Sequence, residues 1–143
     1  MNEGQAEIIY GSNNFKMQEP ELANGSYFAP IVMENMNTDS QIYREEFFGP
    51  VFNLFKVETS KEAMDLANKS DYGLSGAVFT NDLDKAEAAA QRMRVGNVFI
   101  NTFTALHSDH PSGGIKDSGY GRECYSDGLI GMGNRKTIIR RPL

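Results

Sequence analysis

Three apolar segments alternate with two amphipathic ones over residues 51–101, and this alternation most constrains the fold. The apolar segments, 51–57, 76–80 and 97–101, have strand composition. Between them, Thr59 and Glu62 form a capping box, and Asn81 or Asp82 caps a second helical pattern. Because each connection is longer than a dozen residues and contains a helix, the strands are expected to run parallel. The sequence therefore predicts an α/β protein built on a parallel βαβαβ unit.

Shorter elements are expected on both sides of this unit. Residues 7–10 and 27–33 read as strands, and Pro30 places the second at a sheet edge because proline donates no ladder hydrogen bond. A weak helix is expected over 122–132. Residues 136–141 read as a final strand with no partner near it in the sequence, so we expect it to pair elsewhere, often on another subunit.

Composition excludes several classes of protein. The chain has 143 residues, enough for one domain, and a net charge of −5, which argues against general nucleic-acid binding. One cysteine and two histidines make neither an internal disulfide nor an ordinary zinc site. No apolar run is long enough for a membrane span, and no signal peptide is recognisable. The expectation is a cytoplasmic protein with no metal, nucleic-acid or membrane partner.

Three further features could carry chemistry, and a structural interpretation is favoured for each. Cys124 is the only thiol, but no local pattern supplies a base or an oxyanion site. His107 and His110 flank Asp109 in a loop where their spacing fixes no common face for a metal ion. The glycine-rich segment 113–122 matches neither a Walker A motif nor a dinucleotide fingerprint, so taken alone it is a loop.

The segment that points most specifically to a ligand is the acidic and aromatic stretch 45–50, which lies directly before an expected strand. A carboxylate can accept hydrogen bonds from both hydroxyls of a ribose, and an aromatic ring can pack on a flat heterocycle. The alternative is a charged helix end followed by aromatic residues of the core. From these residues alone, both interpretations remain open.

Together, several motifs resemble the carboxyl-terminal part of the NAD(P)-dependent aldehyde dehydrogenase superfamily. They follow one another in the family's order over nearly the whole chain: Glu45-Glu46-Phe47-Phe48-Gly49-Pro50-Val51, Leu66-Ala67-Asn68, Tyr72-Gly73-Leu74-Ser75, Gly96-Asn97-Val98-Phe99-Ile100-Asn101, Ser112-Gly113-Gly114-Ile115-Lys116 and Ser118-Gly119-Tyr120-Gly121-Arg122-Glu123.

The resemblance implies roles for particular residues. Glu46 matches the glutamate that holds the nicotinamide ribose of NAD or NADP, and Phe48 matches the aromatic residue near the nicotinamide ring. Asn101 and the loop to Ser112 match the segment that lines the aldehyde entrance. By the same resemblance, residues 1–133 form the carboxyl-terminal portion of the catalytic domain, and 134–143 form an oligomerisation arm that joins a neighbouring subunit in a homo-oligomer.

Two positions depart from the family pattern. Ser112 stands where many members carry an aromatic residue, so the entrance is expected to admit a polar or acidic aldehyde, with a semialdehyde as one candidate. Asn134 replaces an acidic residue of some members, so charges that bridge subunits cannot be assumed there.

The family's nucleophilic cysteine, general-base glutamate, oxyanion asparagine and dinucleotide-binding sheet lie upstream of the matching region. We therefore expect a piece of an enzyme that oxidises an aldehyde to a carboxylic acid, inactive alone and without a catalytic residue of its own. Two alternatives stay open: a non-catalytic oligomerisation or binding module derived from the family, and a freestanding thiol enzyme that uses Cys124.

Overall fold

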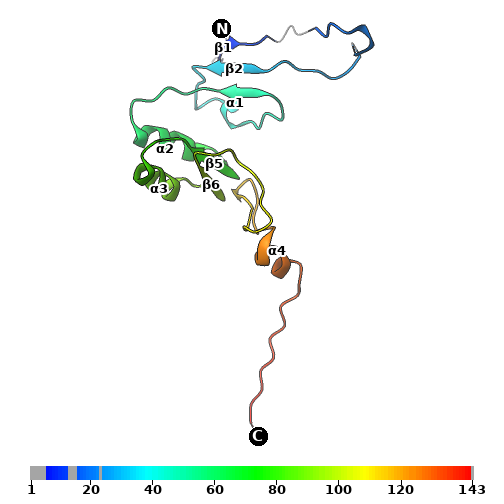
Figure 1. The fold of residues 1–143 in the computed structure, drawn as a ribbon, viewed down its shortest axis with the longest axis vertical. Coiled ribbons are helices and arrows are strands. Elements are labelled where there is room, and N and C mark those ends of the chain that lie inside the picture. The colour runs from blue at the N-terminus through cyan, green and yellow to red at the C-terminus, as the bar shows by residue number, and fades with distance from the viewer. Residues whose placement is uncertain (1–5, 13–15, 23, 143) are drawn as a thin grey trace. The chain divides into compact units, whose positions relative to one another are not determined.

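The structure is a computed structural model and describes residues 6–12, 16–22 and 24–142 (Figure 1). It divides into two compact units, residues 1–58 and 59–143.

The first unit is a three-stranded sheet of β1 (Glu7–Tyr10), β2 (Ile31–Glu34) and β3 (Val51–Asn53), in the order β1-β2-β3. β1 is antiparallel to β2, and β2 is parallel to β3. The 3-10 turn η1 (Pro20–Leu22) lies between β1 and β2. The parallel crossover contains the short helix α1 (Gln41–Arg44), whose first turn Ser40 caps.

The expected edge strand at 27–33 is corrected in both its position and its bounds. β2 begins at Ile31 and is the central strand of the sheet. Pro30 lies just before it, so the missing proline N–H removes no ladder hydrogen bond. The ladder begins where the Ile31 N–H donates to the carbonyl oxygen of Pro50 at 2.9 Å.

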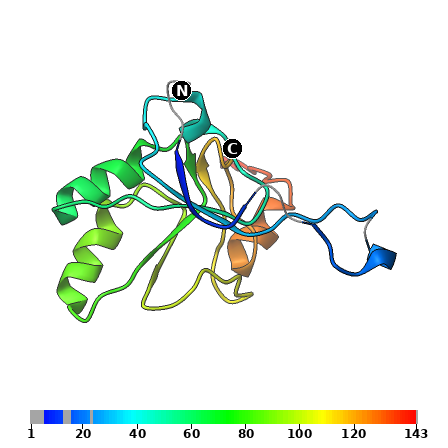
Figure 2. The ribbon, with the colours of Figure 1, turned by 90° about the horizontal axis from the view of Figure 1, so that it is seen from above.

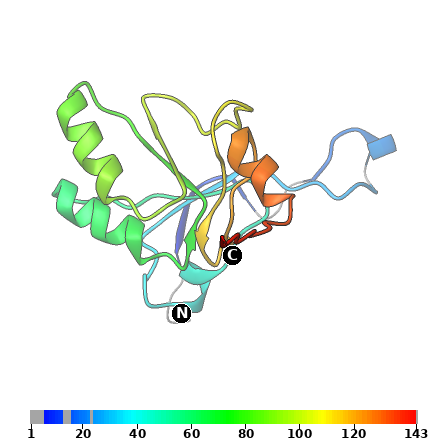
Figure 3. The ribbon, with the colours of Figure 1, turned by 90° about the horizontal axis from the view of Figure 1, so that it is seen from below.

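The second unit contains the expected parallel crossover. β5 (Ser75–Val78) and β6 (Asn97–Ile100) are parallel and are joined through α3 (Leu83–Arg92). The helix α2 (Ser60–Lys69) precedes them and lies beside α3 (Figure 2, Figure 3). β4 (Tyr72–Gly73) and β7 (Ile115–Lys116) form a separate antiparallel pair. The weak helix expected over 122–132 is α4 (Tyr125–Gly131).

The α/β class is confirmed, but β3 does not share a sheet with β5 and β6. Its partner among the described residues is β2, and the Leu54 N–H extends that pairing by donating to the Met33 carbonyl at 2.8 Å. The segment 51–101 therefore contributes to two parallel pairs in separate sheets. Strand pairing joins residues far apart in sequence, so the local pattern could not choose between these partners.

Both helix starts agree with their sequence signals. The Thr59 hydroxyl accepts a hydrogen bond from the Glu62 N–H at 3.1 Å, and the Asp82 carboxylate accepts one from the Lys85 N–H at 3.1 Å. Met64 of α2 and Ala86 of α3 are buried, whereas Leu83 stays largely exposed. In the first unit, Ile31 and Met36 are buried.

The final strand expected at 136–141 is absent from the described chain. Residues 134–142 form neither helix nor strand, and all of them are exposed. The side chains of Ile138 and Ile139 are 83% and 81% exposed. An extended segment needs a second strand for its N–H and C=O groups, and the described chain offers it none. None of the helices in the described part of the chain combines the length and apolar character that crossing a bilayer requires.

Candidate functional site

The two adjacent carboxylates after α1 lie in different environments. Glu45 ends the helix, and its side chain accepts a hydrogen bond from Gln41 Nε2 at 2.9 Å. Glu46 makes no hydrogen bond or ion pair with another described residue, and it is exposed. Of this pair, Glu46 is therefore the carboxylate that is open to a ligand.

Phe48 is presented to solvent by a tight turn. The Gly49 N–H donates to the Phe47 carbonyl at 2.8 Å, and the Val51 N–H donates to the Gly49 carbonyl at 2.8 Å. The Phe48 ring is 95% exposed, so in the described chain it does not act as a core aromatic residue.

A hollow of about 630 Å³ adjoins this turn. It is bordered mainly by aromatic residues and small turn residues: Ser26, Tyr27, Phe28, Phe47, Phe48, Gly49 and Pro50. An open carboxylate two residues from an exposed ring suits a ligand that offers hydroxyl groups beside a flat heterocycle. The residues present thus fit the ribose and nicotinamide of a dinucleotide.

Asn101 follows β6 with φ of 55°, in the left-handed region. Its side-chain amide forms two hydrogen bonds with the backbone of Thr80, accepting from the N–H at 2.8 Å and donating to the carbonyl at 2.9 Å. The amide therefore joins the segments that follow β5 and β6.

Ser112 is held in place from two sides. Its backbone N–H and C=O form an isolated bridge with Glu123, at 2.9 and 2.7 Å. Asn97, at the start of β6, accepts from the Gly113 N–H at 3.3 Å and donates to the Pro111 carbonyl at 3.3 Å. The Ser112 hydroxyl lies 3.5 Å from the Asn97 amide oxygen.

A hollow of about 240 Å³ lies beside Ser112. Its other lining residues come from β5, β6 and the loops around them: Leu74, Ser75, Asn97, Phe99, Thr104, Ala105, Leu106 and Glu123. The structure thus brings Ser112 together with Thr104, Ala105 and Leu106 of the same loop. No sequence pattern singles out these three residues within the loop.

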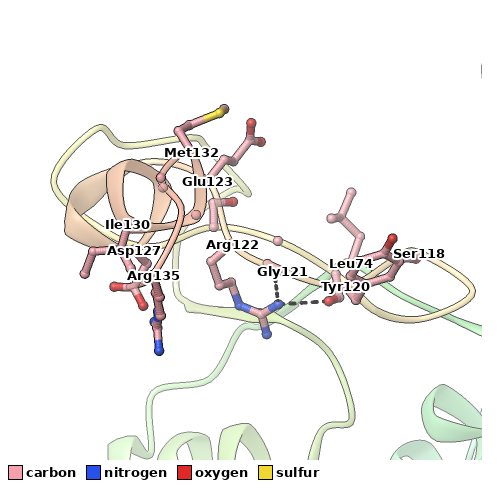
Figure 4. Close-up of a pocket in the computed structure, with 16 residues that line it drawn as sticks. Leu74, Ser118, Tyr120, Gly121, Arg122, Glu123, Asp127, Ile130, Met132 and Arg135 are labelled. Carbon is pink, nitrogen blue, oxygen red and sulfur yellow. Dashed lines mark hydrogen bonds between the residues drawn. The ribbon is translucent and has the colours of Figure 1, made fainter. Parts of the chain in front are cut away.

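The two cationic side chains of the glycine-rich segment, Lys116 and Arg122, donate hydrogen bonds to backbone carbonyls. Arg122 Nη1 donates to the carbonyls of Gly114 at 2.9 Å and Gly121 at 2.6 Å (Figure 4). Lys116 Nζ donates to three carbonyls near the end of α2. A larger hollow of about 930 Å³ adjoins the segment and α4. This arrangement agrees with a structural loop and does not form a phosphate cradle.

The sequence model described as "Aldehyde dehydrogenase family" matches residues 1–138. The chain belongs to the aldehyde dehydrogenase family.

Two curated members of the aldehyde dehydrogenase family illustrate the sequence similarity. The succinate-semialdehyde dehydrogenase [NADP(+)] of Deinococcus radiodurans is 44% identical over 125 residues, which cover 87% of this chain and 26% of the relative. The betaine aldehyde dehydrogenase of Bacillus subtilis is 43% identical over 123 residues, covering 86% and 25%. The chain spans about a quarter of the length of these relatives.

A solved aldehyde dehydrogenase gives the same result for the fold. The betaine aldehyde dehydrogenase of Staphylococcus aureus in complex with NAD⁺ aligns with a TM-score of 0.81 at 41% identity. The alignment covers 88% of this chain and 25% of that structure.

In the described residues, no hydrogen bond joins the Cys124 thiol to a base. Cys124 is half-buried just before α4, and its carbonyl accepts a hydrogen bond from the Gly128 N–H. His110 Nδ1 lies 2.9 Å from Asp109 Oδ1, and this hydrogen bond lowers the pKa of the Asp109 carboxyl. In residues 6–12, 16–22 and 24–142, no group of three or more His, Cys, Asp or Glu side chains could hold a metal ion.

Proposed function

We propose that this chain supplies cofactor-binding and aldehyde-facing residues of an NAD(P)-dependent dehydrogenase that oxidises an aldehyde to a carboxylic acid. The observation that carries the proposal is the open Glu46 carboxylate two residues from the exposed Phe48 ring. Family membership supports it, and so does the structure of the S. aureus relative in complex with NAD⁺.

In this proposal, Glu46 accepts hydrogen bonds from the nicotinamide ribose, and Phe48 packs near the nicotinamide ring. The bound dinucleotide supplies the oxidant for the aldehyde. The names of the relatives include both NADP(+) and NAD⁺. Either cofactor is compatible with Glu46, because this carboxylate would address the ribose on the nicotinamide side.

The nucleophilic thiol is proposed to come from residues outside this sequence. The chain spans about a quarter of its curated relatives, which leaves most of their length to supply it. Cys124, the only cysteine of the chain, lies directly before α4 with its backbone in the left-handed region, at φ of 61°. We propose that Cys124 has a structural role and that the chain alone does not oxidise aldehydes.

For the substrate, we propose a polar or acidic aldehyde, with a semialdehyde as the first candidate. The small Ser112 side chain borders the hollow that Thr104, Ala105 and Leu106 also line, and its hydroxyl adds a polar group to that wall. The D. radiodurans relative carries the name succinate-semialdehyde dehydrogenase, which supports this choice.

For assembly, we propose that residues 134–142 pair with a second copy of the protein in a homo-oligomer. The exposed Ile138 and Ile139 side chains favour burial against a partner. The basic residues Arg140 and Arg141 follow them and keep the free segment soluble.

The test is NAD(P)H formation, followed by absorbance, in the dehydrogenase that contains these residues. A panel of succinic semialdehyde, betaine aldehyde and a long aliphatic aldehyde is offered to wild type and Ser112→Phe. We expect Ser112→Phe to lower kcat/KM for the acidic aldehyde relative to the aliphatic one, because a ring takes the space beside Leu106. An unchanged order of substrates would contradict the role of Ser112, and no aldehyde oxidation at all would favour the non-catalytic module.

The isolated chain of residues 1–143 is the second arm of this test. We expect no NAD(P)H from it with any aldehyde of the panel. Oxidation by the isolated chain that disappears in Cys124→Ser would overturn the structural role of Cys124 and establish a freestanding thiol enzyme.

A further inference from the structure

Lys116 Nζ sits among three backbone carbonyl oxygens, those of Asn68 at 3.2 Å, Ser70 at 2.8 Å and Tyr72 at 3.3 Å. An ammonium group has three N–H donors, and each has an acceptor here. The carbonyls belong to the last turn of α2 and the residues that follow it. That helix end carries the negative pole of the helix dipole, which favours a cation.

The backbone around Lys116 is fixed by further hydrogen bonds to the same segment. Lys116 and Ile115 pair with Tyr72 and Gly73 in the β4–β7 ladder. The Asp117 N–H donates to the Asp71 carbonyl at 3.0 Å. Lys116 itself has φ of 55°, a backbone conformation that is strained for a residue with a side chain. A non-glycine residue here suggests that its side chain is needed.

The network continues from α2 to α3 through Asn68. The Asn68 side chain donates to the Arg92 carbonyl at 2.9 Å and accepts from the Arg94 N–H at 2.7 Å. The Asn68 carbonyl is one of the three that receive Lys116. One ammonium group thus links β7 to the carboxyl-terminal ends of two helices.

We propose that Lys116 is a positioning residue whose ammonium group is the built-in cation of a three-carbonyl cage. By filling the cage, it fixes β7 and the segment just before it, which contains Ser112 and the buried Gly114. The consequence for the aldehyde entrance rests on the proposed function, whereas the cage itself is independent of that function. The class of ligand that the cage accepts is a primary ammonium ion.

The test uses the full chain and a chemical rescue. Lys116→Ala removes three methylenes and the ammonium group, which n-propylammonium can replace. We expect Lys116→Ala to melt at a lower temperature than wild type, and millimolar n-propylammonium chloride to raise the Tm of this variant alone by about 2–4 °C. Tetramethylammonium chloride at equal ionic strength has no N–H donor and is expected to give no such rise. Absence of a selective rise would overturn the cage.

A second variant covers the case in which Lys116→Ala does not fold. Lys116→Met keeps the aliphatic stem and removes only the donors. We expect faster amide hydrogen exchange at residues 112–118 in this variant, and unchanged exchange there in the control Lys61→Met, whose side chain is 76% exposed on α2. Wild-type exchange at 112–118 in Lys116→Met would overturn the proposal.

The enzyme provides a readout for positioning. In the dehydrogenase, Lys116→Met is expected to raise the KM for the aldehyde several-fold and leave the KM for the dinucleotide unchanged. An unchanged aldehyde KM would overturn the link to the entrance. Since the rescue experiment uses neither aldehyde nor cofactor, its result separates a failure of the cage from a failure of the proposed function.

Discussion

The side-chain amide of Asn101 makes the two hydrogen bonds with the Thr80 backbone that a neighbouring strand would otherwise make. It accepts from the Thr80 N–H at 2.8 Å and donates to the Thr80 carbonyl at 2.9 Å, and so extends the β5–β6 pairing beyond the last residue of either strand. In the same way, Asn97 fixes the far end of the loop by its bonds to Pro111 and Gly113. Two asparagines, one at the start of β6 and one directly after its end, thus hold both ends of the loop between residues 101 and 112.

Substitutions at Asn101 test how this loop is anchored. Asn101→Ala loses both side-chain hydrogen bonds and places alanine at φ of 55°, so we expect a loss of about 2–3 kcal/mol in the free energy of unfolding. Asn101→Gly loses the same bonds but tolerates the backbone, and it should be about 1 kcal/mol less damaging. Urea denaturation of both variants measures the difference. Equal stability of the two would show that the backbone conformation costs nothing.

Two segments of the second unit approach each other closely at Gly96 and Gly113, and a substitution at Gly96 tests this packing. A Cβ added at Gly96 would lie 1.7 Å from the carbonyl oxygen of Gly113, so the backbone would have to move. We expect Gly96→Ala to cost about 1–3 kcal/mol, as overpacking does. The control is Gly131→Ala, where nothing lies within 4 Å of the added Cβ. Thermal unfolding compares them, and a Gly96→Ala variant as stable as Gly131→Ala would contradict the packing.

The start of α3 gives a pH dependence. Hydrogen bonds from the Lys85 side chain, then from its backbone, lower the pKa of the Asp82 carboxyl, and the same pair raises the pKa of Lys85. A carboxyl group whose pKa is lowered by folding stabilises the fold above its unfolded pKa, about 4, and this contribution is lost as the pH falls through the lower folded value. A raised lysine pKa gives a contribution that is present below about 10.5 and lost above it.

Asp82→Asn is therefore expected to have a smaller free energy of unfolding than wild type at pH values between about 4 and 10.5. Below the folded pKa of Asp82, the two proteins should be equally stable. Asparagine retains the capping oxygen, so the difference reports the Lys85 pair. Because both side chains lie at the surface, added salt should reduce the difference. Urea titrations at pH 2.5, 7 and 9 measure it, and an equal difference at every pH would contradict the assignment.

What the sequence could predict depended on local signals. Thr59 and Asp82 cap helices because their side chains reach N–H groups three residues away, and that spacing is visible in the sequence. The crossover from β5 to β6 follows from the helix between them. The resemblance pointed to Glu46 and Phe48, and the open carboxylate and exposed ring are consistent with that interpretation without testing it.

The remaining features depend on contacts that no local pattern encodes. β3 pairs with β2, and 17 positions separate the last residue of β2, Glu34, from the first residue of β3, Val51. Composition cannot select a partner at that distance in the sequence. The Lys116 cage consists of backbone carbonyls, which every residue type carries. Residues 136–141 have strand composition, yet a strand forms only where a second chain segment completes its ladder.

Truncation tests the assembly proposal. We expect the protein ended after Gly133 to lose its oligomeric state, because Ile138 and Ile139 are removed together with the backbone that would pair. Arg140→Ala with Arg141→Ala is the control, since it changes charge and leaves that backbone in place. Light scattering gives the mass of each species. If the truncated protein keeps the mass of the wild-type oligomer, residues 134–142 are not the arm.

The measurement that tests the central claim most directly compares Glu46→Gln with Glu45→Gln in the dehydrogenase that contains these residues. Glu46 is the open carboxylate, and its hydrogen bonds to ribose hydroxyls would be charge-assisted. Glu46→Gln should therefore weaken binding of the dinucleotide by roughly 10-fold or more and leave folding intact. Glu45 already accepts a hydrogen bond from Gln41, and its variant should bind the dinucleotide as wild type does. The KM for NAD(P) and kcat are measured for all three proteins. Wild-type values for Glu46→Gln would contradict the account.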